Sequence, residues 1–288
     1  MATAVIYGGL GNQLFKYFAA LKLSKLHGTN LYLDLSWYSD ATQKQIGTNR
    51  RLFELNEFPN ITLNLKSPSR LRVLVLNSLQ KKFPIEIQST LGIVSDSNYF
   101  QVKRFVISRG NFENFDYLPD LKILQNALSV DKNSNSWLDK TLALAQLEKP
   151  ICIHVRMTDY RKFNSIYDVL SIGYYTSALK RIQSMIGESP IWLFSDNPHS
   201  ARDFLKSRIK INRIMPLSSQ SSSVDTMVAM SSCRAIISAN STFSWWAGLR
   251  GSIYGTAEVV VQPKVYDTIA GEGHSMTVPL SNWFVCEN

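Results

Sequence analysis

The chain has 288 residues, 45% of them hydrophobic and 18% charged, which is typical of a globular protein and allows one large domain or two of ordinary size. Its formal net charge of +9 predicts an acidic ligand or surface, such as a nucleotide, a nucleic acid or an anionic membrane. Nucleic acid is the partner that we disfavour, because the sequence has no zinc-finger spacing, no RNP motif and no long basic helix.

The first predicted unit consists of a strand, a glycine-rich loop and a helix. A short β-rich run covers Thr3–Tyr7, the loop Gly8–Gln13 follows, and a helical stripe of apolar residues then continues to Gly28, which ends the helix. Asn30–Leu35 predicts the next strand. This order of elements is the start of a Rossmann-like half.

The middle of the chain, residues 40–135, has a less regular pattern. The polar stretch Asp131–Ser136 is a candidate boundary, and Leu138–Leu147 predicts a linking helix behind it. We therefore expect an N-terminal domain over residues 1–135 and a C-terminal domain over residues 136–288.

The alternation of strands and helices is clearer in the second half. Buried strands are predicted at Ile151–Val155, Ile191–Phe194, Ala235–Ser238 and Glu258–Gln262. Helical patterns lie between them at Tyr174–Ile186, Ser200–Lys206 and Val224–Ser232. Such alternation implies parallel crossovers, so the expected fold is α/β, with two Rossmann-like domains facing a cleft.

Polar side chains follow the apolar strand Ile151–Val155 at once. Ligands of open parallel sheets bind just beyond the carboxyl ends of the strands, where Arg156 can serve a phosphate and Asp159 a proton transfer. A surface salt bridge that caps the strand is the alternative. His154 inside the apolar run favours function, because a buried strand seldom carries a basic group without a partner.

The glycine-rich loop is a second candidate. At Gly9, Gly11, Asn12 and Gln13 a ligand can approach the backbone next to a helix N-terminus. The loop does not have the G-x-G-x-x-G spacing, and a tight strand-to-helix turn without a ligand is an equal alternative.

Two further motifs follow predicted strands. Asp196, in Phe194–Pro198, either caps the following helix or accepts hydrogen bonds from a base or ribose. In Ser238–Ala247, small polar residues stand where a helix begins, which predicts a cradle for a diphosphate or, alternatively, an unusually rich N-cap. Trp245 and Trp246 are expected to pack in the core.

A metal site is not expected. The sequence has no Asp-x-Asp, and its four histidines, His27, His154, His199 and His274, lack the spacing of metal ligands. Positive side chains, Arg156 first among them, and helix termini would then neutralise a diphosphate.

The location expected for the protein is the cytoplasm. Met1–Tyr7 has no basic segment of the kind that begins a secretory signal, and no apolar stretch reaches 18 residues. Of the three cysteines, Cys152 and Cys233 lie in or beside apolar runs and are expected to be buried free thiols.

Four separated motifs occur in order: G-G-L-G-N-Q-L-F-K-Y, H-V-R-M-T-D-Y, F-S-D-N and I-S-A-N-S-T-F-S-W-W-A. Together they resemble the bacterial α-1,2-fucosyltransferases, glycosyltransferase family 11. The resemblance spans nearly the whole chain, although residues 40–135 match loosely. It implies a GT-B fold, GDP-β-L-fucose as the donor, no metal or other cofactor, and an inverting single displacement onto the 2-hydroxyl of a terminal galactose. It also implies that residues 1–135 form the acceptor-side domain and residues 136–288 the donor-binding domain.

The resemblance also implies roles for single residues. Arg156 matches the family arginine that holds the donor β-phosphate, His154 lies beside it in the guanosine site, and Asp196 matches a guanine or ribose contact. Asp159 matches the carboxylate of the family pattern H-x-R-R-x-D and is the best candidate for a general base. The phosphate-side loop would consist of Asn240, Ser241, Thr242, Phe243 and Ser244.

Two residues depart from the family pattern. Met157 replaces the usual second arginine, and Thr158 the common glycine. The second phosphate contact is therefore open, with Arg161 and Lys162 as candidates. Two rival functions also stay open: transfer from another donor such as a UDP-hexose, and nucleotide or glycan binding without catalysis, which Met157 favours.

The acceptor is not specified by the sequence beyond a terminal galactose. By analogy with bacterial relatives, we expect an O-antigen or similar surface glycan on a lipid carrier at the inner membrane. Between Glu57 and Glu86 the chain has no acidic residue, whereas basic and leucine-rich residues are frequent there. This segment predicts either reversible contact with an anionic membrane or a helix packed into the N-terminal core. Its basic residues are Lys66, Arg70, Arg72, Lys81 and Lys82.

Overall fold

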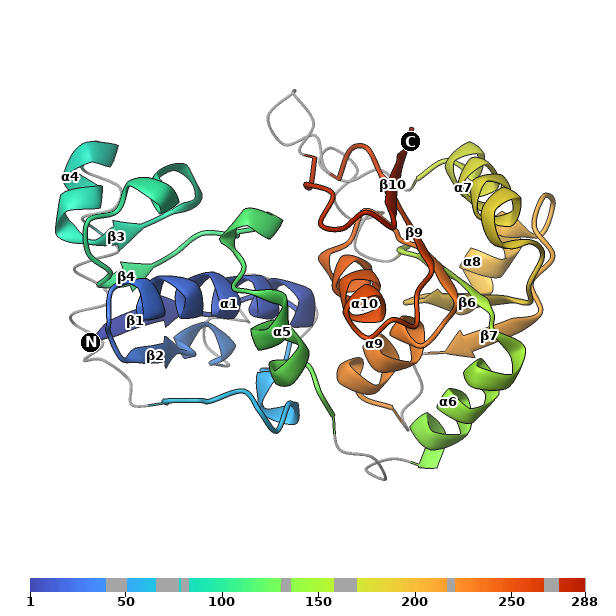
Figure 1. The fold of residues 1–288 in the computed structure, drawn as a ribbon, viewed down its shortest axis with the longest axis horizontal. Helices are drawn as coiled ribbons and strands as arrows, with labels where there is room; N and C mark the ends of the chain where they lie inside the picture. Colours follow the sequence, from blue (N-terminus) through green and yellow to red (C-terminus); the bar gives the residue numbers. More distant parts are fainter. Residues whose placement is uncertain are drawn as a thin grey trace. The chain divides into compact units, whose positions relative to one another are not determined.

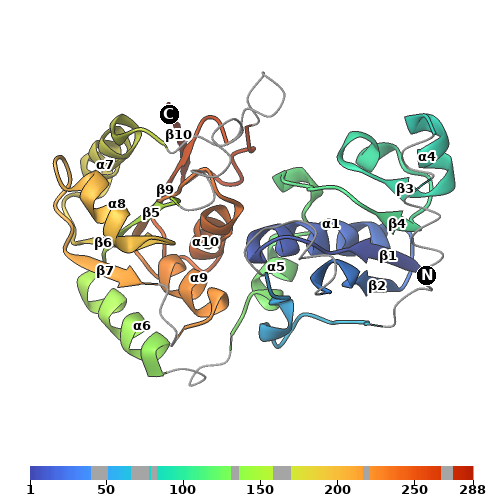
Figure 2. The ribbon, with the colours of Figure 1, turned by 180° about the vertical axis from the view of Figure 1, so that it is seen from behind.

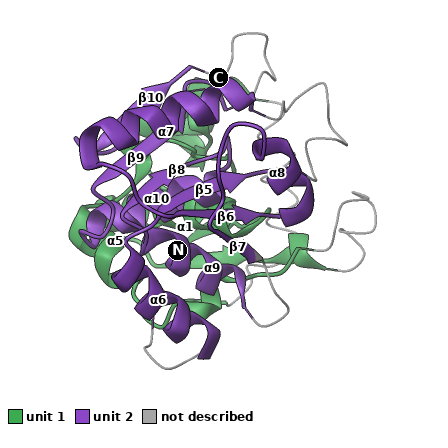
Figure 3. Cartoon of the chain, turned by 90° about the vertical axis from the view of Figure 1, so that its right-hand side faces the viewer, with its two compact units in different colours: residues 1–129 green, residues 130–288 purple. Residues whose placement is uncertain are grey.

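The computed structural model describes residues 1–39, 51–65, 78, 83–130, 136–157, 170–216, 221–266 and 275–287. The chain forms two compact units, Met1–Ser129 (unit 1) and Val130–Asn288 (unit 2) (Figure 3). The expected position of the boundary, after residue 135, stays a prediction, because residues 131–135 lie outside the described residues.

Unit 1 contains a parallel sheet in the order β2-β1-β4-β3 (Figure 1). Its strands are β1 (Ala2–Val5), β2 (Leu31–Asp34), β3 (Ile93–Val94) and β4 (Ile107–Ser108). Its helices are α1 (Leu10–Leu26), α4 (Ile85–Leu91) and α5 (Leu121–Ala127), and 3₁₀ turns are η1 (Ser36–Tyr38), η2 (Leu55–Glu57), η3 (Asp96–Gln101) and η4 (Phe115–Tyr117).

Helix α1 is the main packing element of unit 1. It contacts β1 and β2 and lies alongside them in both opposite views (Figures 1 and 2). Leu14, Phe15 and Phe18 on the predicted stripe are fully buried. The chain leaves the helix through Gly28, whose φ of +57° is the left-handed conformation that glycine adopts without strain. The predicted strand, loop and helix are therefore confirmed.

Unit 2 contains a parallel sheet of six strands in the order β10-β9-β8-β5-β6-β7. The strands are β5 (Ile151–Val155), β6 (Ile191–Ser195), β7 (Arg213–Pro216), β8 (Ala235–Ile237), β9 (Val259–Pro263) and β10 (Trp283–Cys286). The helices are α6 (Ser136–Glu148), α7 (Ile172–Ile186), α8 (Pro198–Leu205), α9 (Ser223–Ser231) and α10 (Thr242–Ile253).

The strand order shows that unit 2 is doubly wound. The chain starts at the central strand β5, proceeds outward through β6 and β7, and returns to the other side of β5 for β8, β9 and β10. The order therefore reverses between β5 and β8, which are paired from Ile151 with Ala235 to Ile153 with Ile237. The predicted α/β class with two Rossmann-like halves is confirmed.

The two faces of β5 have different neighbours. Ile151, Ile153 and Val155 belong to one apolar cluster with residues of α7 and α8. Because successive side chains of a strand point to opposite faces, His154 points away from that cluster, and its ring centroid lies 5.9 Å from that of Phe243 in α10.

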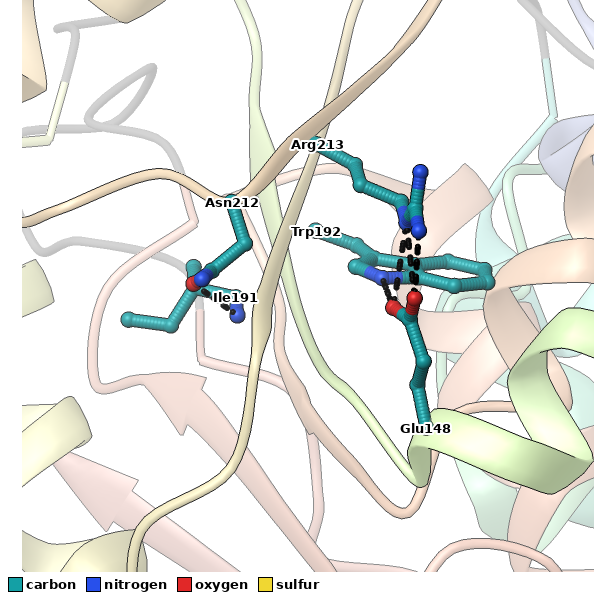
Figure 4. Close-up of polar contacts among 5 residues, drawn as sticks. All are labelled: Glu148, Ile191, Trp192, Asn212 and Arg213. Carbon is teal, nitrogen blue, oxygen red and sulfur yellow. Dashed lines mark hydrogen bonds and ion pairs between the residues drawn. The ribbon is translucent and has the colours of Figure 1, made fainter.

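The amino-terminal ends of β6 and β7 are fastened to α6 by one carboxylate (Figure 4). Glu148, the last residue of α6, accepts a 2.8 Å hydrogen bond from the buried indole Nε1 of Trp192. The same carboxylate pairs with Arg213, whose Nε donates to Oε1 at 3.0 Å and to Oε2 at 3.1 Å. Beside them, the Ile191 amide donates to Asn212 Oδ1 at 2.9 Å.

Other sequence predictions have a clear outcome. Trp245 and Trp246 are fully buried, as expected of core residues. Cys152 and Cys233 are buried free thiols. Among the described residues, no helix is long and apolar enough to cross a membrane. The basic, leucine-rich segment predicted to contact a membrane is mostly outside the described residues, which include only residue 78 between 66 and 82.

Candidate functional site

The topology of unit 2 selects one edge of its sheet as the place for a ligand. Ligands of doubly wound sheets bind at the carboxyl ends of the strands, where the strand order reverses. In unit 2 this point lies between β5 and β8. His154 and Arg156 stand at the end of β5, and Ser238 with Asn240 follows β8.

Arg156 is held by Asp196, which follows the neighbouring strand β6. The guanidinium Nε lies 3.3 Å from Asp196 Oδ2, and the two side chains are only 18% and 10% exposed. Asp196 Oδ1 also accepts a 2.8 Å hydrogen bond from the backbone amide of Met157. The carboxylate therefore fixes both the side chain and the loop that carry the positive charge, a preorganised arrangement for binding an anion.

The structure also decides between the alternatives for Asp196. Helix α8 is capped by Asn197, whose Oδ1 accepts a hydrogen bond from the Ser200 amide at 3.2 Å. Asp196 therefore does not cap this helix. Its direct contact with a base or ribose stays a prediction, whereas its role in positioning Arg156 is visible in the structure.

His154 is a neutral imidazole in this site. Its side chain is 3% exposed, and burial, followed by the nearby Arg156 charge, lowers its pKa to about 4 although the Asp196 carboxylate opposes the shift. Within the described part of the chain, His154 Nδ1 has no hydrogen-bond partner. A buried polar atom at the ligand edge that lacks a partner is suited to bind a polar group of a ligand.

Two tyrosines of α7 support the strand ends from the apolar face. Tyr175 donates to the carbonyl oxygen of His154 at 3.2 Å, and Tyr174 donates to that of Ser238 at 2.7 Å. Ser238 Oγ is a buried hydroxyl without a partner among the described residues. Sequence reasoning gave Ser238 no role of its own. The sequence feature that could have identified Ser238 is its place at the end of a buried strand, before a run of small polar residues.

The residues of the predicted phosphate-side loop, at the start of α10, fall into a buried group and a half-buried group. Asn240 and Ser244 are buried anchors: Asn240 Nδ2 donates to the Tyr266 carbonyl at 3.3 Å, and Ser244 Oγ accepts from the Ala239 amide at 3.1 Å. Ser241, the N-cap residue, makes no side-chain capping bond, and it is half-buried together with Thr242 and Phe243.

The second group, Ser241 to Phe243, is therefore the part of this loop that a ligand can reach. The positive end of the α10 dipole lies there, next to the predicted position of the diphosphate.

The predicted residues of the glycine-rich loop lie in unit 1, at the start of α1. Gly8 has a φ of +87°, and Tyr38 donates to its carbonyl at 3.0 Å. Gln13 is fully buried, and among the described residues its side-chain amide bonds backbone groups of Gly8, Leu52 and Glu54. Gln13 therefore has a structural role. Contacts of a ligand with Gly9, buried Gly11 and half-buried Asn12 stay predictions.

Two sequence predictions near β5 have different outcomes. Asp159 lies outside the described residues, as do Thr158, Arg161 and Lys162, so the predicted base stays a prediction. Met157 is 3% exposed and belongs to the apolar cluster of unit 2 that also contains Leu170. The side chain that replaces the family's second arginine is thus part of the core.

The described residues contain no group of three or more His, Cys, Asp or Glu side chains that could hold a metal ion. Metal independence nevertheless stays a prediction, because parts of the chain lie outside this description.

The chain is similar to known glycosyltransferases over most of its length. The sequence profile of glycosyl transferase family 11 matches residues 1–269. The O-antigen biosynthesis glycosyltransferase WbnK of Escherichia coli is 28% identical, over 96% of this chain and 97% of that protein. An alpha-1,2-colitosyltransferase of Escherichia coli is 23% identical, over 85% of this chain and 86% of that protein.

A solved structure supports the fold. The crystal structure of the alpha-1,6-fucosyltransferase NodZ soaked with GDP-fucose matches with a TM-score of 0.51 and 12% identity, over 90% of this chain and 92% of that one. At this level of identity the likeness shows the fold alone, and it confirms the expected GT-B-like α/β class.

Proposed function

The chain belongs to glycosyl transferase family 11, and from this premise we propose that it transfers L-fucose from GDP-β-L-fucose to the 2-hydroxyl of a terminal β-galactoside. The observation that carries the proposal is the Arg156–Asp196 pair, in which Arg156 follows β5, one of the two strands between which the strand order of unit 2 reverses. There a fixed guanidinium suits a nucleoside diphosphate leaving group.

The chemistry of transfer explains why such a group is needed. As the bond to fucose breaks, negative charge grows on the β-phosphate and the sugar becomes cationic. Arg156, already held by Asp196, stabilises that charge without reorganising, and the start of α10 adds backbone dipoles. The neutral His154 ring and Phe243 provide a polar atom and an aromatic face for the nucleoside.

Inversion requires attack by the acceptor hydroxyl from the side opposite the diphosphate. We assign the general base to Asp159 on its match to the family pattern. Asp159→Asn should bind GDP-fucose normally and turn over about 10²–10⁴ times more slowly, measured by initial rates and by calorimetric titration of GDP. A large rise in the donor Kd with little change in kcat would assign Asp159 to donor positioning instead.

The cellular role that we propose is synthesis of an O-antigen or similar surface polysaccharide, on a lipid-linked acceptor. The similarity to WbnK, an O-antigen biosynthesis glycosyltransferase, supports this role.

A second candidate is transfer of colitose with the same linkage, because an alpha-1,2-colitosyltransferase is among the relatives. Colitose lacks the 3-hydroxyl of fucose, so a site that hydrogen-bonds this hydroxyl favours fucose strongly. Competition between the GDP derivatives of the two sugars for one acceptor would measure the preference directly.

The deciding experiment is a panel of β-galactosides incubated with GDP-fucose, with release of GDP and NMR analysis of the product linkage. We expect an α-1,2 product and a rate that survives excess EDTA. Turnover only with a UDP-hexose would establish the rival donor, and GDP binding without turnover on any galactoside would establish a binding protein. Complete loss in EDTA that Mn²⁺ or Mg²⁺ restores would reveal a metal site.

A further inference from the structure

The loop Arg109–Phe112 of unit 1 occupies the place that corresponds to the ligand edge of unit 2. The sheet of unit 1 has the order β2-β1-β4-β3, so its strand order reverses between β1 and β4. The glycine-rich loop follows β1, and Arg109–Phe112 follows β4. Both loops thus lie at the carboxyl edge where doubly wound sheets bind ligands.

This loop is held in a strained conformation by Asp96, which begins η3 after β3. The Asp96 carboxylate accepts hydrogen bonds from the amides of Asn111, at 3.0 Å, and Phe112. Phe112 has a φ of +55°, a conformation that bulky residues rarely adopt, and its ring is buried. A Cβ on Gly110 would lie 2.3 Å from Asp96 Oδ2, so only glycine allows the carboxylate to approach this closely.

A buried lysine holds the same loop from α1. Lys16 is 1% exposed, and its Nζ donates to Asn111 Oδ1 at 3.3 Å and lies 3.8 Å from the ring centroid of Tyr7. Burial lowers the Lys16 pKa to about 8, while the carboxylates of Glu113 and Asp96 oppose this shift. Tyr7 Oη in turn shares its single proton between the Gly110 carbonyl, at 3.1 Å, and Asn111 Oδ1, at 3.2 Å.

These contacts fix the orientation of the Asn111 amide. Lys16 and Tyr7 both donate to its oxygen, and an ammonium has no acceptor, so Oδ1 must face inward. The Nδ2 group, with its two N–H donors, therefore faces away from Lys16 and Tyr7, and Asn111 is an exposed residue. The positive charges of Lys16 and Arg109 are matched by the carboxylates of Asp96 and Glu113, so the surroundings suit a neutral hydroxyl group better than a phosphate.

We propose that Lys16 is a positioning residue for the acceptor: it aligns Asn111 so that Nδ2 donates to a hydroxyl of the acceptor sugar. The proposal rests on the proposed fucosyl transfer to a galactoside. Stability alone does not explain a lysine in this place, because an apolar side chain of the same length would fill the space without burying a charge. A buried ammonium that contacts this four-residue loop, and a strained residue within the loop, are features that function retains.

The test compares Lys16→Met, Asn111→Ala and the double variant with the wild-type protein. Each single variant should raise the KM for the galactoside about 3- to 10-fold, the effect of one lost hydrogen bond, and leave kcat and the KM for GDP-fucose within about twofold. Because Lys16 acts through Asn111, the double variant should be no worse than Asn111→Ala. Lys25→Met, on the exposed side of the same helix, is the control and should behave as wild type.

The melting temperature separates positioning from general damage. Lys16→Met should melt at the wild-type temperature or above it, because it removes a buried charge. Three results would overturn the proposal: an unchanged acceptor KM in Lys16→Met, a parallel fall in kcat and donor affinity, or additive effects in the double variant.

Failure of the proposed function gives a different result. If the wild-type protein transfers fucose to no galactoside, that function is wrong, and glycan binding by saturation-transfer NMR then tests the loop directly. Loss of galactoside saturation in both single variants but not in Lys25→Met would support the positioning role. Equal saturation in all proteins, or none in any, would end it.

Discussion

At the scale of single residues, Arg156, His154 and Lys16 are basic side chains that lie largely out of solvent and are stabilised in three different ways. Arg156 keeps its charge because Asp196 pairs with it, and His154 is neutral because burial lowers its pKa. Lys16 lies against an aromatic ring and a fixed amide. Each of these groups would be more stable in water, so its burial lowers the stability of the fold and keeps the group in place for a ligand.

The sequence predicted two of these three residues. His154 and Arg156 stood out because they interrupt or end a wholly apolar strand. Lys16 was missed because a lysine on an amphipathic helix is usually solvated. Its burial, and its contacts with Tyr7 and Asn111, are seen only in the structure. The pairing of Arg156 with Asp196 depends on the adjacency of β5 and β6, which strand patterns alone do not show.

The Arg156 side chain should be essential for transfer. Arg156→Ala is expected to lower kcat/KM by about 10²–10³-fold, since one preorganised donor to a developing anion contributes about 2–4 kcal/mol. Arg156→Lys should restore little, because an ammonium cannot replace the planar fork of the guanidinium. Initial rates and circular dichroism would measure activity and folding, with the exposed Arg208→Ala as the control. A kcat/KM for Arg156→Ala within about threefold of wild type would contradict the donor-site assignment.

The buried His154 should make unit 2 less stable in mild acid. Its pKa is about 4 in the folded chain, below the ordinary value of 6.5, so between these pH values the unfolded chain binds a proton that the folded chain does not. Above pH about 6.5 the His154 ring is neutral in both states and lowers the stability of the fold least. As the pH falls from about 6.5 towards about 4, the free energy of unfolding decreases.

Urea unfolding, followed by tryptophan fluorescence, would measure this effect. From pH 7.5 to 5 the free energy of unfolding should fall by up to about 2 kcal/mol more in the wild type than in His154→Gln. Trp37 is the only tryptophan before residue 130, so the signal reports chiefly on unit 2. Equal losses in the two proteins would mean that His154 is already charged in the folded state.

At the scale of elements, the four strands that the sequence predicted in unit 2 are buried along their whole length. Ile151–Val155 was predicted to the residue, and the other interior strands of unit 2 to within one or two residues. The strands that were missed are short or lie at sheet edges: β7 contains Arg213 and ends in Pro216, and β3 has only two residues. Edge strands tolerate charged residues and proline because one side of the ladder is unpaired, which removes the pattern that identifies them.

The Glu148 carboxylate should link α6 to the sheet. In Glu148→Ala the buried Trp192 indole N–H loses its acceptor, which should lower the free energy of unfolding by about 1–3 kcal/mol. Arg213→Ala should have a smaller effect, because Glu148 still accepts from Trp192. Thermal unfolding monitored by circular dichroism would compare the two. Equal losses would show that the ion pair, and not the indole bond, holds the helix.

At the scale of the whole molecule, the alternation of strands and helices was enough to predict two Rossmann-like units. It could not predict unit 1 in detail, because β4 is two residues long and its strand neighbours come from distant parts of the sequence. The same reason hid the loop Arg109–Phe112, whose place at the sheet edge follows from topology and not from any motif.

Association with anionic membranes stays a prediction for unit 1. Five basic residues between Glu57 and Glu86 contribute roughly 1 kcal/mol each near an anionic surface, and Phe83, Ile85 and Ile87 beside them are 37%, 41% and 42% exposed. Co-sedimentation with phosphatidylglycerol vesicles should be strong at low salt and weak at high salt. Replacing the three apolar residues by serine should weaken it, unlike the control Leu147→Ser at an exposed position of unit 2. Equal partitioning onto neutral vesicles, or none onto either, would refute the prediction.

The position of β5 at the centre of its sheet has a consequence for synthesis on the ribosome. β5 is the first strand of unit 2 to emerge, yet one of its two neighbours is β8, which is made only after β6 and β7. Until Ala235–Ile237 has been translated, the apolar Ile151–Val155 has an open edge that can pair with another nascent chain. Slower translation between these strands would prolong this exposure, so the yield of folded protein should depend on the speed of elongation and on chaperones that cover extended apolar segments.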